Sequence, residues 1–308
     1  MGLRFEVEIG GISEGFESAD IPKTTVAPAS YAHGKGKEKG SNNPNAYLRP
    51  GLQTNEPFRL SRNFIGRDPL WQWRKKIVDG IKANQTDYKK TGNLTQYDHD
   101  GTTALAEWDF EGAWISEWVI DPDLDAAGNE ILKEQIVVVA DVLVAKSGGG
   151  GGSRGPTRHP VPYANNKFRV DIEGLGTIDR VKKISGLDSK TEVVTVRAGG
   201  HPGRNTPQTA ANPKVFRPGK TTYTDLTIER YMLDPKPVLR RWWDEYRQGK
   251  MKPRSGSVFI LNDDYSDGPQ LDFFGAIPKD YNAGHRASLQ DDYPTETLVL
   301  SIESLTKK

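Results

Sequence analysis

The sequence predicts a mainly β protein made of two tandem β-sandwich or barrel modules, each with one flanking α-helix. Three observations carry this prediction. Short segments of alternating apolar and polar residues recur along the chain, 32 glycines and 20 prolines supply many turns, and one order of segments occurs twice. At 308 residues the chain is long enough for two domains with separate cores. The predicted modules are residues 1–146 and 163–308, joined by a linker over residues 147–162.

Each predicted module opens with a strand. Residues 5–9 (FEVEI) are followed by Gly11, and residues 168–172 (FRVDI) are followed by Gly174. Apolar and charged residues alternate with a period of two in both segments. This pattern is typical of a strand that buries one face and exposes the other. Further along, residues 60–62 (LSR) correspond to residues 228–230 (IER) as a second shared strand.

One helix is predicted in each module after a proline, Pro69 or Pro237, because proline suits the first turn of a helix. Gly80 and Gly249 are expected to end these helices. Apolar residues at helical spacing form one stripe on each, and these stripes should cap a sheet. The stripes are Leu70, Trp73, Ile77 and Ile81 in the first helix, and Val238, Trp242 and Tyr246 in the second.

The last shared segments are also strands. Residues 108–113 (WDFEGA) match residues 271–276 (LDFFGA), and the modules are expected to close with strands over residues 136–144 and 298–305. Because all these correspondences occur in the same order in both halves, we interpret the chain as an internal duplication.

Two long stretches without hydrophobic periodicity lie at the same place in each module. They cover residues 27–57 and 197–221, and the first contains HGKGKEKGSNNPN. A structureless segment of this length inside a compact domain is usually functional or disordered, and its recurrence favours function. The linker contains SGGGGGSRGPTRHP, a composition typical of a flexible connection, natural or designed.

Composition excludes several classes of protein. The formal net charge is +1, so no excess of basic charge marks a nucleic-acid binder. There are no cysteines, which excludes disulfides and thiolate metal sites. We expect no signal peptide and no membrane anchor, since the first residues lack a basic start with an apolar stretch and no window is apolar enough to span a bilayer.

These features resemble the tail-tube proteins of contractile phage tails and of related extracellular contractile injection systems. The resemblance lies in the opening FxVxI strand, residues 185–187 (SGL) followed by 192–194 (EVV), the LTIER strand at 226–230, the helix with Trp242, and residues 271–278 (LDFFGAIP). The first module departs from this pattern. Residues 18–21 (SADI) replace the SGL turn, and Asp121–Glu130 is interpreted as an insertion.

The resemblance implies a fold of two packed sheets with a flanking helix, in which six modules form a ring around a channel. Rings then stack through the long loops, here residues 27–57 and 197–221. A tandem chain would need only three copies for each ring, giving a homotrimer with pseudo-sixfold symmetry. The segment of 14 residues at 147–160 has a reach of roughly 45–50 Å at ~3.3–3.6 Å per residue, so the linker could join ring neighbours or successive rings. We favour neighbours.

Two sets of contact residues follow from this resemblance. Contacts between rings or subunits are expected at Lys35, Lys37, Lys39, Asn43, Arg204 and Asn205. The outer face of the helices is expected at Trp73, Arg74, Lys75, Arg240, Arg241 and Trp243, where it could meet a sheath. From the residues alone, the lysine run is a solvated loop rather than a nucleic-acid contact, and Trp242 is a core residue.

No catalytic, cofactor or metal site is predicted. None of the five histidines lies at a paired ligand spacing, and no GxSxG elbow occurs. Asp121, Asp123 and Asp125 have the spacing of calcium ligands. However, Ala126 replaces the glycine and Leu132 the glutamate that an EF-hand loop requires, so a turn is the better interpretation.

The leading hypothesis is a non-enzymatic tube subunit in a virion tail or phage-like particle, assembled in the bacterial cytoplasm without a signal peptide. The expected partners are other copies of the chain, a sheath protein, baseplate and tail terminator proteins, and DNA or protein cargo that passes without specific binding. One alternative is a tube initiator or baseplate hub adaptor. Another, from a different class, is a tandem β-sandwich module that binds carbohydrate or peptide through exposed aromatic residues.

Overall fold

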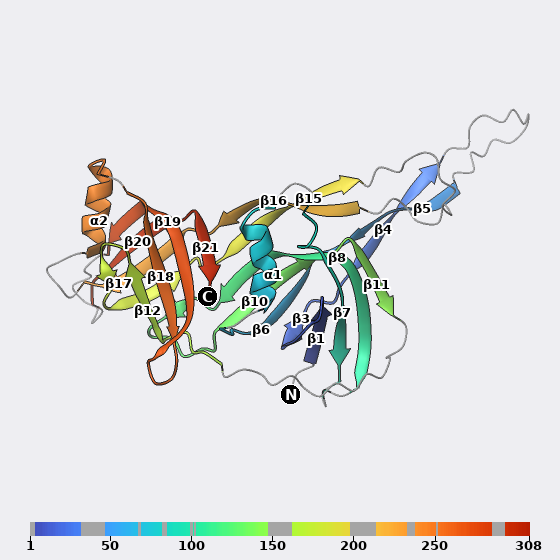
Figure 1. The fold of residues 1–308 in the computed structure, drawn as a ribbon, viewed down its shortest axis with the longest axis horizontal. Coiled ribbons are helices and arrows are strands. Elements are labelled where there is room, and N and C mark those ends of the chain that lie inside the picture. Colours follow the sequence, from blue (N-terminus) through green and yellow to red (C-terminus); the bar gives the residue numbers. More distant parts are fainter. Residues whose placement is uncertain are drawn as a thin grey trace, which may run out of the picture.

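The computed structural model describes residues 4–31, 47–66, 69–81, 85–98, 101, 103–146, 162–197, 214–232, 238–250, 252–284 and 293–308. Within these residues the protein is mainly β, with two large sheets and two helices. Figure 1 shows an elongated molecule, with the first half of the chain on the right, the second on the left, and one helix in each. The predicted fold class is therefore confirmed.

The first half contains one helix and the strands numbered up to β11. Its elements are β1 (Arg4–Ile9), β2 (Ile12–Phe16), β3 (Ser18–Ala19), β4 (Thr24–Tyr31), β5 (Tyr47–Asn55), β6 (Phe58–Asn63), α1 (Pro69–Val78), β7 (Lys90–Tyr97), β8 (Ala104–Asp121), β9 (Leu124–Asp125), β10 (Lys133–Val139) and β11 (Val142–Lys146).

The second half repeats this order with its own helix. Its elements are β12 (Phe168–Ile172), β13 (Gly176–Thr177), β14 (Val181–Ser185), β15 (Ser189–Arg197), β16 (Lys214–Tyr223), β17 (Leu226–Tyr231), α2 (Val238–Arg247), β18 (Arg254–Leu261), β19 (Asp267–Ala283), β20 (Thr295–Ser301) and β21 (Ser304–Lys307).

Strand pairing is the same in the two halves. The first sheet has the order β2-β1-β7-β8-β10-β6-β3, and the second has the corresponding order β13-β12-β18-β19-β20-β17-β14. In addition, β11 pairs with β8 as β21 pairs with β19. The duplication inferred from the sequence is thus present in the backbone as well as in the order of residues.

The opening strands form because their apolar residues all face the core. Phe5, Val7 and Ile9 are buried in β1, while the intervening glutamates are half-exposed. In β12 the buried pair is Val170 and Ile172. The alternation predicted from the sequence is confirmed, since one face of each strand packs into the core and the other does not.

Glycine at one position of each long strand lets it bend. Gly112 in β8 has a φ of +62°, and its counterpart Gly275 in β19 has a φ of +63°. An L-residue rarely adopts this conformation. A Cβ at Gly112 would also lie 2.3 Å from a carboxylate oxygen of Asp141, and one at Gly275 would lie 2.5 Å from the carboxylate of Glu303. The positive φ and the lack of space for a Cβ thus explain why the WDFEGA and LDFFGA segments share a glycine.

The helices bury the predicted stripes in part. Leu70, Trp73 and Ile77 are buried in α1, and Leu239 and Trp242 are buried in α2. Ile81 and Tyr246 lie at the margin and are only partly buried. Two glycines with positive φ, Gly80 and Gly249, follow directly after the helices and end them as predicted. Within the described residues, neither helix has the length and apolarity needed to cross a membrane.

Two predictions about the strands were wrong in detail. The closing segments are two strands each, because the chain turns at Asp141 and at Glu303 and continues on a different stretch of the long strand. The acidic segment Asp121–Glu130 is not an insertion, because residues 122–132 between β8 and β10 are as numerous as residues 284–294 between β19 and β20. The segment seemed additional only because the two loops differ in sequence.

Where the structure describes the stretches predicted to lack regular structure, it shows strands of two antiparallel arms. We call β4 and β5 the first arm, and β15 and β16 the second arm. Figure 1 shows the first arm extending away from the body on the right, whereas the second arm crosses from the left half onto the right half. Their strands lacked a visible period because an arm outside the sandwich does not bury one continuous apolar face.

Candidate functional site

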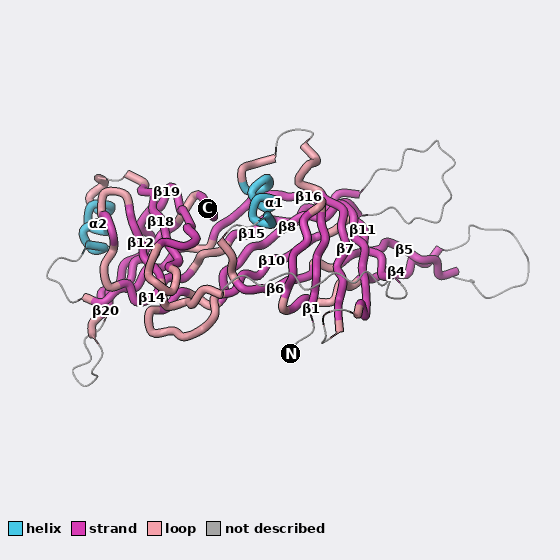
Figure 2. The backbone as a smooth tube through the Cα atoms, turned by 60° about the horizontal axis from the view of Figure 1, so that its bottom comes forward, coloured by secondary structure: helices cyan, strands magenta, loops and turns pink. Residues whose placement is uncertain are grey.

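The main feature with functional character is the junction between the two halves. Strand β15 of the second arm pairs with β8, with Ser189 opposite Trp118 and Lys190 opposite Glu117. Figures 1 and 2 agree in placing β15 and β16 beside β8 and α1. The backbone amide of Phe216 in β16 also donates a hydrogen bond of 2.7 Å to the Asp141 carboxylate. The first sheet therefore continues into the second half of the chain.

A second pair of strands closes the junction at another place. Strand β9 pairs with β14, which puts Leu124 opposite Ile184. Close to it, Asn165 binds the loop after β8. Its side-chain oxygen accepts a hydrogen bond from the backbone amide of Glu130, and its backbone amide donates one to the Glu130 carbonyl, each at 3.0 Å. The acidic loop therefore serves as a docking surface for the chain that follows the linker.

Arg74 of α1 lies at the centre of the junction. Its side chain is fully buried, and its Nη1 atom donates to the carbonyl of Ile115 and to the hydroxyl of Thr191, both at 2.8 Å. Its Nη2 atom donates to the Ser189 hydroxyl at 3.3 Å. Burial lowers the pKa of Arg74 to about 10, although Tyr223 and Glu117 act in the opposite direction. Two hydroxyls of the second arm thus solvate a cation of the first half.

Glu134 of β10 is the second buried centre. Its carboxylate accepts from Arg62 Nε at 2.6 Å, from Lys307 Nζ at 2.8 Å and from the indole of Trp118 at 3.2 Å. The ammonium of Lys307, in β21 of the second half, lies 4.3 Å from the ring centroid of Phe64. Because Glu134 and Lys307 are almost completely buried, each needs the other to offset the cost of leaving water.

The second half carries corresponding residues at the same positions. The register of the strands makes Tyr281 the counterpart of Trp118, and Glu296 the counterpart of Glu134. The Tyr281 hydroxyl donates to Glu296 at 2.9 Å, as the indole of Trp118 does to Glu134. Burial and this hydrogen bond raise the pKa of Tyr281 well above its usual value. Arg230 Nε lies 3.4 Å from Glu296, a looser pair than Arg62 and Glu134.

The counterpart of Arg74 is aromatic. Trp73 and Trp242 correspond, since both are buried and a cation of the following strand lies over each ring. The next residue is Arg74 in α1 and Trp243 in α2. The Trp243 ring is half-buried and stacks near the rings of Tyr281 and Tyr246, with centroids 6.5 and 5.9 Å away. This face of the second half therefore offers aromatic rings where the first offers a cation.

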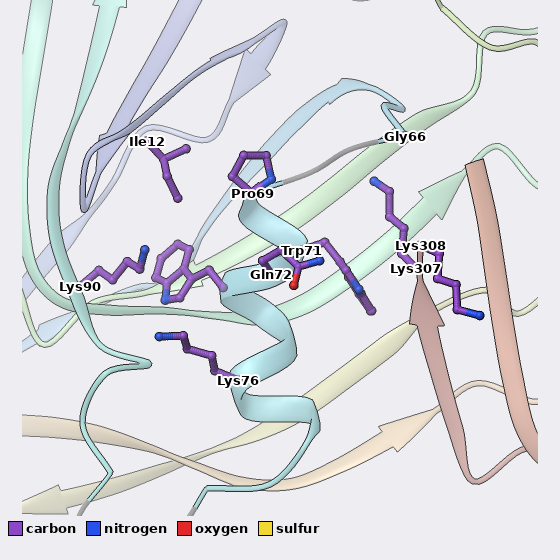
Figure 3. A pocket seen from close by; sticks show the side chains of 10 residues that line it. Ile12, Gly66, Pro69, Trp71, Gln72, Lys76, Lys90, Lys307 and Lys308 are labelled. Atoms are coloured by element: carbon purple, nitrogen blue, oxygen red, sulfur yellow. The ribbon is translucent and has the colours of Figure 1, made fainter. Parts of the chain in front are cut away.

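A cleft of about 520 Å³ lies beside α1. Figure 3 shows Lys76 and Lys90 on one side of the helix, with Lys307 of β21 and the following Lys308 on the other. Burial and the nearby Lys76 lower the pKa of Lys90. The corresponding cleft beside α2 is smaller, about 280 Å³, and mixes carboxylates with cations. In the first cleft, however, Lys76 pairs with Asp87, Lys307 with Glu134 and Lys308 with Asp272, so most of its positive charge is already balanced.

The structure settles the position of only some predicted contact residues. Lys35, Lys37, Lys39, Asn43, Arg204 and Asn205 lie outside the described residues, as do all five histidines. On the helices, Arg240 and Arg241 are exposed and Lys75 is partly exposed. Trp73 and Arg74 are buried, so their placement on the outer helix face was wrong: Trp73 packs beneath the helix, and Arg74 points into the junction.

Two alternatives can be weighed against side-chain positions. Asp125 accepts a hydrogen bond from the amide of Ala127, and Asp123 pairs with Lys183, as expected for a turn rather than a calcium site. Within the described ranges, no group of acidic residues or histidines is arranged to hold a metal ion. Six of the seven tryptophans are buried, which does not fit a sheet face that binds ligand through exposed aromatics.

Sequence reasoning missed Glu134, Lys307, Ser189 and Thr191 as functional residues. One signal was available, since Arg62 and Glu134 recur as Arg230 and Glu296 at buried positions of facing strands. The two hydroxyl residues and Lys307 gave no signal, because their role depends on a face of the other half.

Comparison of the sequence with family models gives one family, and it matches twice. The model for the T4-like virus tail tube protein gp19 matches residues 2–143 and again residues 164–306. The two matches cover most of the chain and leave out the glycine-rich segment between them. Comparison with curated proteins gives no significant match.

Comparison with solved structures gives similar chains. One is in an extracellular contractile injection system, the PVC sheath-tube complex in the extended state, with 15% identity, 46% of this chain, 88% of that chain and a TM-score of 0.39. Another is in the anti-feeding prophage tube terminating cap, with 13% sequence identity, 51% of this chain and 95% of that chain covered, and a TM-score of 0.41. A third is Hcp1 from Flavobacterium johnsoniae, with 16% sequence identity, 49% of this chain and 97% of that chain covered, and a TM-score of 0.27.

Proposed function

Because the chain belongs to the T4-like virus tail tube protein gp19 family, we propose that it is a structural subunit of the inner tube of a contractile phage tail or phage-like injection particle. In this proposal three tandem chains form each ring, so that six modules surround a channel with pseudo-sixfold symmetry. The rings stack into a conduit for DNA or for a protein payload. The chain acts by assembly and passage, with no catalytic step.

The observation that supports this proposal is the direct pairing of β15 with β8. One half of the chain extends an arm onto the sheet of the other, and the order of elements is the same in both. Such a head-to-tail contact generates a ring when its rotation closes. Residues 147–162 would then connect ring neighbours rather than modules in successive rings, because the two modules of one chain already share a sheet.

The outer partners follow from the family and from the exposed cations. Lys75, Arg240 and Arg241 lie at the surface on the helices, and Lys76 lines the cleft beside α1. We assign the face of α1 that carries Lys75 and Lys76 to an acidic segment of a sheath protein. Baseplate and terminator proteins would contact the two ends of the tube, within a particle assembled in the bacterial cytoplasm.

Stacking between rings is assigned to residues 27–57 and 197–221, which contain most of the first arm, most of β16 and the segments that connect the strands of each arm. Lys35, Lys37 and Lys39 would meet acidic residues of the adjacent ring. Replacing the three lysines by glutamate should shorten the tubes without preventing single rings. Tubes of unchanged length would contradict this assignment.

Electron microscopy of the purified chain tests the whole proposal. Stacked rings with threefold symmetry and three chains in each, counted by native mass spectrometry, are the expected result. Single closed rings that never stack would indicate an initiator or hub adaptor instead. A protein that stays monomeric at every concentration and salt condition would contradict a tube function.

A further inference from the structure

The junction inside one chain also describes a junction between chains, and this inference rests on the proposed ring. The acceptor face of the first module consists of Arg74, Trp118 and Glu134. On the second module the same positions are Trp243, Tyr281 and Glu296, which we call the second acceptor face. The second arm and β21 fill the first acceptor face with Ser189, Thr191 and Lys307.

The first arm has its own counterparts of these inserted residues. The register of the arms makes Thr24 the counterpart of Ser189, and Val26 the counterpart of Thr191. In the closing strands, Ala145 occupies the position of Lys307. In the single chain these three residues are exposed, and Val26 retains 51% of its accessible surface. Their counterparts in the second half are buried.

The uncovered surfaces lie at opposite ends of the molecule. Figure 1 shows the first arm reaching out on the right and α2 at the far left, so a second copy can present α2 and β19 to the first arm. The ion pair of the second acceptor face is also incomplete. Arg230 Nε and Glu296 Oε1 are buried and make no hydrogen bond within the described residues, whereas Arg62 and Glu134 are bonded at 2.6 Å.

We propose that the first arm of one chain docks on the second acceptor face of another copy, and that the two junctions of the ring have different, non-interchangeable chemistry. The junction within a chain is polar, with hydroxyls against a guanidinium and an ammonium against a carboxylate. The junction between chains is less polar, with Val26 against the ring of Trp243 and Ala145 beside the Tyr281 and Glu296 pair, and Thr24 keeps the one hydroxyl at the position of Ser189. Trp243 is then a chain–chain contact rather than a sheath contact.

This chemistry enforces alternation of the modules. A first arm placed on a first acceptor face would put the Val26 side chain against Arg74 in place of the Thr191 hydroxyl, which accepts its hydrogen bond, while Thr24 would keep a hydroxyl at the position of Ser189. Ala145 would leave Glu134 without the Lys307 ammonium. Buried charges without partners are strongly unfavourable, so this pairing is rejected. Only a ring in which first and second modules alternate gives each arm the acceptor face that matches its side chains.

A pair of engineered cysteines tests the pairing in the full chain, which has no cysteine of its own. The template pair is Lys190 opposite Glu117. Its counterpart between chains is Thr25 opposite Asp280, and facing residues in antiparallel strands lie at a distance that a disulfide can span. Under mild oxidation, Thr25→Cys with Asp280→Cys should give covalently closed trimers. The matched control, Thr25→Cys with Glu117→Cys, should give no links between chains.

A charge exchange gives a second, reversible test. Trp243→Arg puts a cation on the second acceptor face and should weaken association between chains at least tenfold in sedimentation experiments. Adding Val26→Thr should restore most of it, because the hydroxyl can then accept from the new guanidinium. Tyr265→Arg, at an exposed aromatic of the β18–β19 turn, is the control and should leave assembly unchanged.

The outcomes separate this inference from the proposed function. Wild-type rings combined with Thr25–Glu117 links, or with normal assembly of Trp243→Arg, would overturn the alternation and leave the tube function standing. Rings in which neither cysteine pair links chains would overturn the strand register. A wild-type chain that forms no ring would overturn both proposals together.

Discussion

In the first module, the face beside the helix is covered by the second half of the chain, and it buries Arg74, Arg62 and Glu134 with their partners. In the second module Trp243 and Tyr281 take the places of Arg74 and Trp118 and are half-buried, whereas the buried pair is kept as Arg230 and Glu296. The backbone plan is the same. The difference therefore lies in what covers each face, and it teaches that a duplicated module can keep its fold while its contact surfaces diverge.

The physical reason is the cost of burying charge. A cation can be placed inside only where another segment supplies acceptors, and the second arm supplies two hydroxyls to Arg74. A face that is covered only when another copy binds costs less free energy in the uncovered chain when it carries aromatic rings, because rings tolerate both water and burial.

The sharpest comparison is between the two buried glutamates. Glu134→Ala should destabilise the chain by about 3–5 kcal/mol, because it leaves the buried Arg62 and Lys307 without their shared carboxylate. Glu296→Ala should cost less, since it removes one looser pair with Arg230. Urea unfolding followed by tryptophan fluorescence measures both free energies. Equal losses would mean that Lys307 adds nothing to the first face.

Glycine replacements test the part that the modules share. Gly112→Ala and Gly275→Ala should each cost about 1–2 kcal/mol, because both residues have positive φ. Gly176→Ala is a control for the backbone contribution, since its φ is also positive but no atom lies near its added Cβ. Thermal unfolding of the three variants should give similar losses for the first two. A large difference between them would break the shared backbone plan.

The carboxylate of Asp188 gives a pH-dependent comparison at the junction. Burial raises its pKa above the ordinary value, so the charged form is disfavoured in the folded state. Its contribution to stability is therefore unfavourable at neutral pH, and it is relieved as the pH falls through the raised folded pKa. Asp188→Asn should stabilise the chain at pH 7, and this gain should shrink toward pH 4. A gain that is independent of pH would contradict the assignment.

The smallest effect is expected at the surface of the helices. Lys75 pairs with Asp79 on α1, and Arg240 pairs with Asp244 on α2, all four being well exposed. Asp79→Asn and Asp244→Asn should each change the free energy of unfolding by less than about 0.5 kcal/mol. Denaturant titrations of these variants provide a baseline for the buried pairs. A larger loss in one helix alone would show that its surface pair is not equivalent to the other.

Much of the fold could be predicted because it depends on local pattern. The alternation at Phe5, Val7 and Ile9 determines which face of β1 is buried, and the same holds for β12. Gly80 and Gly249 end the helices because glycine readily adopts the positive φ that is needed there, and glycine is visible in the sequence. The closing segments were harder, because the turn at Asp141 moves the chain to another stretch of β8 without interrupting the apolar residues.

The junction could not be predicted from the same patterns. Arg74 looked like a residue of the outer helix face, since a charged residue next to an apolar stripe usually faces water. It is buried because Ser189 and Thr191, far along the chain, supply acceptors there. Lys307 shows the same dependence, as its ammonium is buried only where Glu134 of the other half receives it.

By itself the sequence determined the duplication, the two helices, the strands with one buried face and the segment that connects the halves. These features follow from short-range spacing, which steric and hydrophobic rules act on directly. Only the tertiary structure decided that the second arm lies on the first module and that the first arm points outward. The reason is that spacing specifies the two faces of a strand, whereas the identity of the neighbour on each face depends on residues distant in the chain.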